Sequence, residues 1–310
     1  MLANLPVELI LLICEYPELE DLRQLAWTNK RMMRIIQKYL PIVLVLGGRI
    51  LFYLPCKNSN IDEGRICLFD SHTNSVKQIA RFTNYLRSYE VATTKDKIFA
   101  LTRKEELFEI FDLNTRQITR GPDPPAWRWI TSIAYYKDKL YYLGGETKRV
   151  DVLIDETWET GPAFPLPITR VQAITCDEVL YVIDGWGRDG NKIYRLSDDE
   201  REWIEIGEIP EGQSLFGIAS LNRRIYITGG CWDGVLKFCL CFDPSAPVDS
   251  RISRIADMNY ARINHSLIVA NGKLYAVGGY QEFVHENVCN SIEGYDPQTN
   301  KWQEVGEFNI

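Results

Sequence analysis

The chain has 310 residues, a formal net charge of −7 and a sequence pI of about 5.2, with 45% hydrophobic and 25% charged residues. This length can bury a full core without disulfides or metal ions, and the acidic balance, with no basic stripe, excludes the usual nucleic-acid-binding surface. No stretch approaches the roughly 18 uninterrupted apolar residues of a membrane span, and the N-terminus lacks the basic start of a signal peptide. We therefore expect an intracellular protein, cytoplasmic or nuclear, that binds neither nucleic acid nor membrane.

Residues 1–40 have the apolar spacing of short helices. Apolar residues from Leu5 to Tyr16 follow helical spacing until Pro17 ends the first helix. A second short helix is expected around Leu22 and a third after Thr28, a suitable N-cap residue. Three short helices cannot bury an independent core. This segment must therefore bind a partner or pack on the rest of the chain.

From residue 41 onward, a short aromatic and aliphatic run that ends in Gly-Gly recurs. The second glycine of the later copies stands at Gly145, Gly185, Gly230 and Gly279, at steps of 40, 45 and 49 residues. We assign Ile42–Gly48 as the first copy, and a degenerate run without glycines, Lys97–Leu101, fills the long gap between them. Such a period is the signature of a repeat architecture.

Each copy has the elements of a four-stranded unit. An apolar run and a turn signal precede it, and a third run ending in an acid follows it. A fourth run often holds Trp, at Trp158, Trp203 and Trp302. Four strands in about 45 residues are typical of a β-propeller blade. In this assignment the first unit begins at its Gly-Gly strand and lacks an inner strand, which would leave the ring incompletely closed.

The repeat resembles the kelch motif, with its Gly-Gly pair, a Tyr before it and a Trp in the last strand. This resemblance covers residues 41–310 and implies a mainly β fold: a six-bladed kelch-type β-propeller behind a small N-terminal three-helix segment. We expect two domains, a helical head at 1–40 and the propeller at 41–310, with six units of which the first is incomplete. In this family the chain ends usually share one blade.

The head resembles an F-box. The resemblance rests on the order of residues from Leu5-Pro6 to Asn29-Lys30, and it implies docking on a Skp-type adaptor and a cullin ubiquitin ligase. The residues that would contact the adaptor are Leu5, Pro6, Leu9, Ile13, Leu22 and Leu25. Two alternatives stay open: a helical cap that shields the propeller, or the remnant of the helical region that precedes the propeller in BTB-kelch proteins.

The sequence offers no catalytic or metal-binding constellation. It contains three scattered histidines, no Gly-x-Ser-x-Gly elbow and no phosphate-binding loop. The eight cysteines lack the paired spacing of a zinc site. We therefore expect a protein that is not an enzyme and carries no cofactor.

In kelch propellers, the loops before each first strand and those after Gly-Gly line one mouth of the ring. Arg, Trp and Tyr are typical of interface hot spots, and guanidinium groups suit carboxylate ligands. The residues predicted to contact a target are Arg87, Arg128, Trp129, Arg170, Trp186, Phe216, Trp232, Arg262, His265 and Tyr280. An acidic peptide is the ligand that this composition favours. The alternative is that some of these arginines pair with nearby acids and stabilise the loops.

Two functional interpretations follow from the resemblances. The first is a non-catalytic substrate-recognition subunit of a Skp–cullin–F-box-type ubiquitin ligase, with the target held at the propeller mouth. The second is a kelch scaffold of the BTB-kelch, cytoskeletal or signalling type, with the head as a structural cap.

Overall fold

The computed structural model describes residues 44–46, 49–58, 61–70, 73–82, 90–94, 97–103, 106–112, 117–185, 191–209, 213–283 and 288–307. Regular structure in these ranges consists of 24 β-strands and one short 3-10 helix, η2 (Val248–Ser250). None of the described helical structure has the length and hydropathy needed to cross a membrane. The head expected at residues 1–40 lies outside the described residues.

The strands form six four-stranded antiparallel sheets, which we call blades 1 to 6. Each blade is built from four strands consecutive in the chain. Blades 1 to 3 are β1 (Leu44–Leu46), β2 (Arg49–Asn58), β3 (Ile61–Asp70) and β4 (Ser75–Phe82); β5 (Glu90–Thr93), β6 (Lys97–Thr102), β7 (Leu107–Asp112) and β8 (Ile118–Arg120); β9 (Thr131–Tyr136), β10 (Lys139–Gly144), β11 (Asp151–Ile154) and β12 (Thr157–Thr160). Blades 4 to 6 are β13 (Gln172–Cys176), β14 (Val179–Ile183), β15 (Asn191–Leu196) and β16 (Trp203–Ile209); β17 (Gly217–Leu221), β18 (Arg224–Thr228), β19 (Cys239–Phe242) and β20 (Ile252–Arg254); β21 (Ser266–Ala270), β22 (Lys273–Val277), β23 (Ser291–Asp296) and β24 (Lys301–Glu307).

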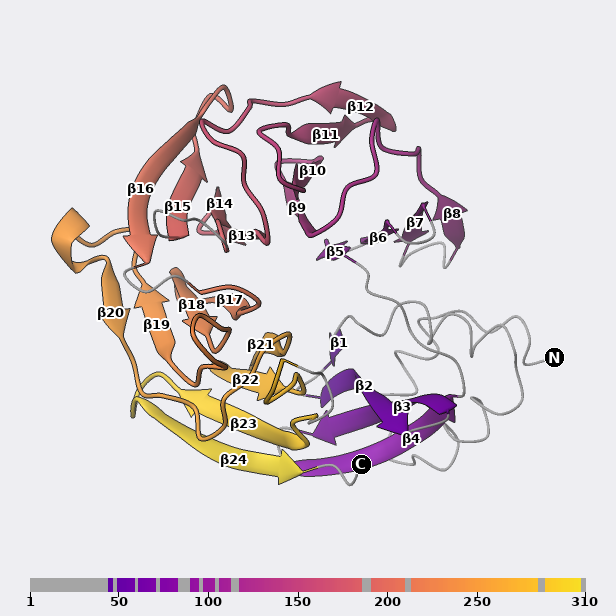
Figure 1. Ribbon diagram of the computed structural model, residues 1–310, viewed down its shortest axis with the longest axis vertical. Coiled ribbons are helices and arrows are strands. Elements are labelled where there is room, and N and C mark those ends of the chain that lie inside the picture. Colours follow the sequence, from indigo (N-terminus) through magenta and orange to yellow (C-terminus); the bar gives the residue numbers. More distant parts are fainter. Residues whose placement is uncertain are drawn as a thin grey trace.

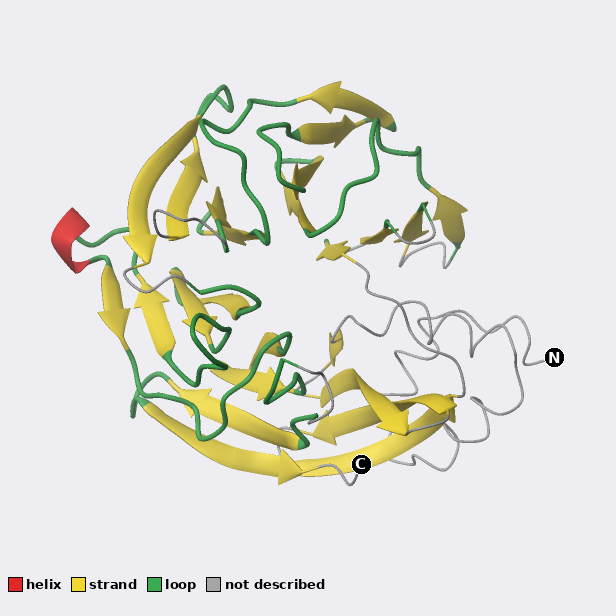
Figure 2. Ribbon diagram, viewed as in Figure 1, coloured by secondary structure: helices red, strands yellow, loops and turns green. Residues whose placement is uncertain are grey.

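The blades follow one another around a common axis, with the first strand of each blade nearest the centre (Figure 1). Coloured by secondary structure, the ring is strand throughout, with loops at the strand ends and η2 at its outer rim (Figure 2). The first strands β5, β9, β13, β17, β21 and β1 contact one another in that order. This arrangement is the mainly β architecture expected of a kelch-type propeller.

The tight turns between first and second strands come from residues that tolerate positive φ. Lys137 and Asp138 have φ of 45° and 60°, and Asn271 and Gly272 have φ of 49° and 70°. Two consecutive residues of this kind join antiparallel strands with the twist that the sheet requires. The turn signals noted in the sequence therefore mark hairpins, as predicted.

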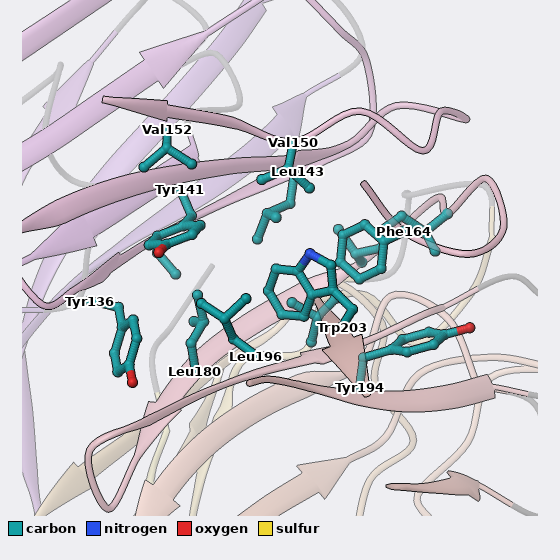
Figure 3. Packing of buried hydrophobic residues seen from close by; sticks show 14 residues of the cluster. Tyr136, Tyr141, Leu143, Val150, Val152, Phe164, Leu180, Tyr194, Leu196 and Trp203 are labelled. Carbon is teal, nitrogen blue, oxygen red and sulfur yellow. The ribbon is translucent and has the colours of Figure 1, made fainter. Parts of the chain in front are cut away.

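Neighbouring blades pack through large apolar side chains. Between blades 3 and 4, Tyr141 and Val152 face Leu180, Tyr194 and Trp203 (Figure 3). The strands read as nearly continuous apolar runs because both faces of each sheet are covered.

In blades 3, 4 and 6, the tryptophan of the fourth strand donates a hydrogen bond to the loop that leads into the blade. The indole Nε1 of Trp203 donates to Pro162 O at 2.9 Å, and the Trp203 ring stacks on Phe164 with centroids 4.4 Å apart. Trp158 and Trp302 make the same kind of bond, to Pro122 O and Ala256 O, both at 2.8 Å. Each indole therefore contributes apolar area to the interface and one hydrogen bond across it.

Blade 1 is complete, and the assignment of its Gly-Gly strand was wrong. β1 pairs antiparallel with β2, with Leu46 opposite Arg49. Gly47 and Gly48 therefore stand between two paired strands, where Asn271-Gly272 stands in blade 6, and the second strand is β2. A glycine pair serves a hairpin as well as a strand end, so the motif alone could not separate the two positions.

The first and last blades meet without sharing a strand. β1 contacts β21, and β4 contacts β24. Phe69 of β3 lies in one apolar cluster with Ile268, Tyr275 and Ile292 of blade 6. The N-terminal and C-terminal blades are thus joined by side-chain packing, in place of the shared blade that the resemblance implied.

Candidate binding face of the propeller

Two sets of loops lie at the same end of the ring because successive strands of a blade run in opposite directions. One set leads from each fourth strand to the next first strand, and the other joins second to third strands. We call this end the mouth. Its described loop residues are 103, 106, 121–130, 145–150, 161–171, 184–185, 213–216, 229–238, 255–265, 278–283 and 288–290.

Arg128 is buried inside blade 3, and both terminal nitrogens of its guanidinium group are hydrogen-bonded there. Its Nη2 lies 2.9 Å from Asp151 Oδ2 and donates to Tyr142 O at 3.0 Å. Its Nη1 donates to Gly144 O at 3.1 Å and to Arg149 O at 2.8 Å. Burial lowers the pKa of this guanidinium and the Asp151 carboxylate opposes that shift. Arg128 therefore holds the Gly-Gly loop to the strand beneath it.

Arg262 does the same in blade 6. Arg262 and Glu293 are both fully buried, with Nη2 3.0 Å from Oε1. Nη1 donates to Gly278 O at 3.0 Å and to Ser291 O at 2.8 Å. The Glu293 carboxylate also accepts the backbone N–H groups of Asn259 and Tyr260. A buried charge is tolerated only when it is paired and hydrogen-bonded in this way.

The same position recurs in the other blades without charge. In blade 5, Gln213 replaces the arginine and its Nε2 donates to Gly229 O at 3.1 Å, while Leu240 stands at the position of the acid. In blade 4 the two positions hold Ile168 and Tyr194, both buried. Arginine and acid thus occur together or not at all in these four blades. We call the position of the arginine the brace position. It holds Arg128, Ile168, Gln213 and Arg262 in blades 3 to 6.

Arg128 and Arg262 therefore lie in the interior of their own blades. Both were predicted to face a target, but the terminal nitrogens of both guanidinium groups bind carboxylates and carbonyls of their own blades. The alternative interpretation, in which arginines pair with nearby acids, holds at these two positions. The signal available in the sequence was the acid within an otherwise apolar third strand, Asp151 and Glu293.

His265 and Phe216 are interior residues as well. Both stand where a loop of the mouth enters a first strand. The equivalent residues of blades 3 and 4, Thr131 and Val171, are buried too. The His265 Nε2 lies 2.8 Å from Thr228 Oγ1, and burial, followed by the nearby charge of Arg262, lowers the His265 pKa to about 3. Phe216 is part of the core between blades 4 and 5. Neither side chain is placed to touch a target.

Other predicted residues do reach the surface of the mouth. Trp129 is 57% exposed and Trp232 is 62% exposed. Arg170 and Tyr280 are partly exposed, and Arg170 has a φ of 50°. Arg87 and Trp186 lie outside the described residues. Sequence reasoning missed further exposed apolar side chains in these loops, because single apolar residues in a loop carry no periodic signal: Ile130, Leu166 and Phe283.

Comparison with known proteins gives the same repeat. Residues 261–309 match a family model described as the Kelch motif. Kelch-like protein 23 of Homo sapiens is 29% identical over 302 residues, covering 90% of this chain and 51% of the relative. Alpha-scruin of Limulus polyphemus is 30% identical over 156 residues, covering 44% of this chain and 17% of the relative. These matches support a kelch-repeat protein. The chain spans about half, or less, of these relatives.

A solved structure agrees on the fold. A novel fungal alcohol oxidase of the AA5 family, in complex with copper, aligns with a TM-score of 0.59 at 13% identity, covering 87% of this chain and 66% of that one. At this identity the likeness concerns architecture alone. Within the described part of this propeller, no three His, Cys, Asp or Glu side chains come together to hold a metal.

Proposed function

We propose that this chain is a kelch scaffold that binds a protein target through the mouth of its propeller. The observation that carries the proposal is the exposure of large apolar side chains in loops at that end, above all Trp129 and Trp232. Exposed tryptophans at an otherwise polar surface are typical of interface hot spots. Kelch domains in general bind protein targets.

The brace position supports this proposal. Arg128 directly precedes Trp129, and its guanidinium makes an ion pair and three bonds to carbonyls within blade 3. The loop is therefore held before a partner arrives, and a rigid loop loses less conformational entropy on binding. The buried arginines thus serve binding by positioning the loops, without touching the target.

The proposal is tested by cross-linking at the mouth. A photoreactive amino acid at Asn264, an exposed mouth residue, should capture a partner in cells, and the yield should fall in a Trp129→Ala/Trp232→Ala variant that remains folded. The same probe at Thr299, in the turn between β23 and β24, is the control at the opposite end of the ring. Equal capture from Thr299, or capture unaffected by the double substitution, would contradict binding at the mouth.

The role of the head is a separate proposal. The match to Kelch-like protein 23 covers 90% of the chain and so leaves about 31 of 310 residues outside, fewer than the 40 residues of the head. Part of the head therefore aligns with that relative. The first candidate is a head derived from the region that precedes the propeller in BTB-kelch proteins.

A ubiquitin-ligase subunit is the second candidate, favoured by the F-box-like order of residues from Leu5 to Leu25. Co-purification with a Skp-type adaptor separates the two. If the head is an F-box, the wild-type chain retains the adaptor, and a Leu9→Asp/Ile13→Asp variant with an intact propeller releases it. If wild-type protein does not bind the adaptor, the ligase candidate fails and the scaffold remains.

A further inference from the structure

Three loops of blades 5 and 6 form one continuous surface at the mouth. Backbone hydrogen bonds join loop 255–265 to loop 229–238 on one side and to loop 278–283 on the other. Arg262 N donates to Leu236 O at 3.0 Å in the first contact, and two bonds of 2.9 Å hold the second. Hydrogen-bonded chains lie about 5 Å apart, so this surface is about 10 Å wide at the level of these bonds. We call the three loops the blade 5–6 corner.

The blade 5–6 corner exposes large aromatic side chains. Trp232 on one outer loop is 62% exposed, and Phe283 on the other is 54% exposed. Tyr260 on the middle loop is 36% exposed. Exposed aromatic area on adjoining loops marks a contact surface more often than isolated apolar residues do. These side chains are therefore available to an apolar partner.

The charged residues of the corner leave a small negative balance. The described charges of the three loops, taken with their ion-pair partners on the strands, are four acids and three bases: Asp233, Asp257, Glu282 and Glu293 against Lys237, Arg254 and Arg262. The net charge of the corner is therefore −1. A cationic occupant is attracted to it and an acidic one is repelled.

The chain that precedes the propeller leaves the ring beside this corner. The turn between β1 and β2 lies at the end of the ring opposite the mouth, as all turns between first and second strands do. β1 therefore begins, at Leu44, on its mouth side. β1 also contacts β21 of blade 6. The residues directly before Leu44 thus start from the mouth end of the ring, next to blade 6.

The sequence directly before β1 predicts a basic amphipathic helix. At 100° per residue, the apolar residues of segment 28–40 fall within an arc of about 160°: Met32, Met33, Ile35, Ile36, Tyr39 and Leu40. The segment has no acid, and its four bases fall on the other side: Lys30, Arg31, Arg34 and Lys38. A helix of this length is about 20 Å long and is marginal on its own in water. Its apolar face therefore needs a surface to cover.

We propose that residues 28–40 form this helix and that its apolar face covers Trp232 and Phe283 at the blade 5–6 corner. The inference goes beyond the proposed function, because the occupant is a segment of the chain itself. Its starting point beside blade 6, its length of about 20 Å against a corner about 10 Å wide, and its four positive charges all select this occupant. A target that uses Trp232 must displace the segment, so residues 28–40 act as an internal competitor on one side of the mouth.

Hydroxyl-radical footprinting of the purified full-length chain tests the contact. Trp129 is the internal control, because it lies at the mouth on blade 3 and its exposure of 57% is close to the 62% of Trp232. If residues 28–40 cover the corner, Trp232 should be oxidised about fivefold more slowly than Trp129, as expected for an aromatic side chain desolvated at the centre of a contact. Similar oxidation rates for the two tryptophans in the wild-type chain would overturn the proposal.

Two double variants of the segment test which face makes the contact. Met32→Asp/Ile36→Asp places charge on the apolar face and should raise the oxidation rate of Trp232 to that of Trp129. Arg34→Asp/Lys38→Asp makes the same change at the same spacing on the basic face and should keep at least half of the protection. Protection that survives the first variant, or that is lost equally in both, would contradict a contact through the apolar face. Near-UV circular dichroism verifies that the propeller remains folded.

A photoreactive amino acid at Asp233, which is exposed beside Trp232, identifies the occupant. Irradiation of the purified chain should cross-link it to residues 28–40 of the same molecule, in a product that migrates as a monomer. The same probe at Ala126, an exposed mouth residue on blade 3, should give no such product. Cross-links between two copies of the chain, or equal yields from the two probes, would overturn the proposal. Because the purified chain is tested without a partner, such a failure leaves target binding at the mouth standing, and failure to capture a target in cells leaves this contact standing.

Discussion

The rings of Phe69 and Tyr275 lie 5.4 Å apart, with their planes inclined by 58°, across the junction of blades 1 and 6. Phe69 belongs to β3 and Tyr275 to β22, so the contact joins residues 206 positions apart in the chain (275 − 69). None of the described strands is shared between the two blades. Apolar packing at this junction therefore takes the place of the backbone hydrogen bonds that a shared blade would provide.

Replacing Phe69 by alanine should weaken this junction. The side chain is fully buried, and a Phe→Ala change in a core costs about 3–5 kcal/mol in unfolding free energy. The expected result is a lower melting temperature, with hydrogen exchange accelerated first in β1–β4 and β21–β24. Val248→Ala, at a site 69% exposed, is the control and should change neither quantity. Uniform acceleration across all six blades would contradict a local role for Phe69.

The fourth-strand tryptophans allow packing and hydrogen bonding to be separated. Trp203→Phe keeps a ring against Phe164 but removes the bond to Pro162 O, so we expect a loss of about 1–2 kcal/mol. Trp203→Ala removes both and should cost about 3–5 kcal/mol. Denaturant unfolding monitored by circular dichroism gives both values. Equal losses in the two variants would mean that the hydrogen bond, and not the ring, dominates.

The repeated blades could be predicted from the sequence because each blade repeats the same turn and the same apolar strands. Lys137-Asp138 and Asn271-Gly272 mark hairpins that the structure contains. Blade 1 was misassigned because Gly47-Gly48 fits both a hairpin turn and the end of a strand. The register of β1 on β2 settles the choice, and register depends on contacts that no local motif encodes.

The candidate site was predicted less well, because a loop arginine has the same appearance in a sequence whether it faces solvent or a buried acid. Arg128 and Arg262 were expected to face a ligand, and both are buried against acids of their own blades. Trp129 was predicted as a contact and is exposed, while Arg149 and Ile130 beside it were not singled out. Only the pairing of strands shows that Asp151 and Glu293 occupy equivalent positions.

Because these positions are equivalent, we expect that Arg262 and Glu293 of blade 6 can be replaced together by the residue types of blade 5. Arg262→Gln alone leaves the buried Glu293 carboxylate without its cation and should cost about 3–5 kcal/mol in unfolding free energy. The double variant Arg262→Gln/Glu293→Leu copies Gln213 and Leu240 and should recover much of that loss. Recovery stays incomplete by about 1–3 kcal/mol, because Glu293 also accepts two backbone N–H groups.

A double-mutant cycle measures this coupling. The unfolding free energies of wild type, both single variants and the double variant should show a favourable interaction between the two positions. The matched control is the pair Arg254 and Asp257, an exposed ion pair at 2.9 Å, whose coupling should stay below about 1 kcal/mol. A double variant less stable than Arg262→Gln would show that the two blades are not interchangeable at this site.

His265 should make the propeller sensitive to mild acid. Its pKa is lowered to about 3 in the folded protein, against about 6.5 in an unfolded chain, so between these values the unfolded state binds more protons. The contribution of His265 to the unfolding free energy is therefore complete above pH 6.5. It is lost as the pH falls, by about 2 kcal/mol at pH 5. Glu90, with a pKa raised to about 7 by burial, acts in the opposite direction, so the wild-type profile alone does not isolate the histidine.

The variant His265→Gln isolates the contribution of His265 to the pH dependence of stability. Glutamine does not titrate, so the unfolding free energy of wild type minus that of the variant should fall by about 2 kcal/mol from pH 7 to pH 5, whatever its value at pH 7. Denaturant unfolding at several pH values gives this difference directly. His72→Gln and His285→Gln, at the other two histidines of the chain, are the controls for histidine titration elsewhere. A difference that stays constant between pH 7 and 5 would mean that His265 is protonated in the folded protein as readily as in the unfolded one.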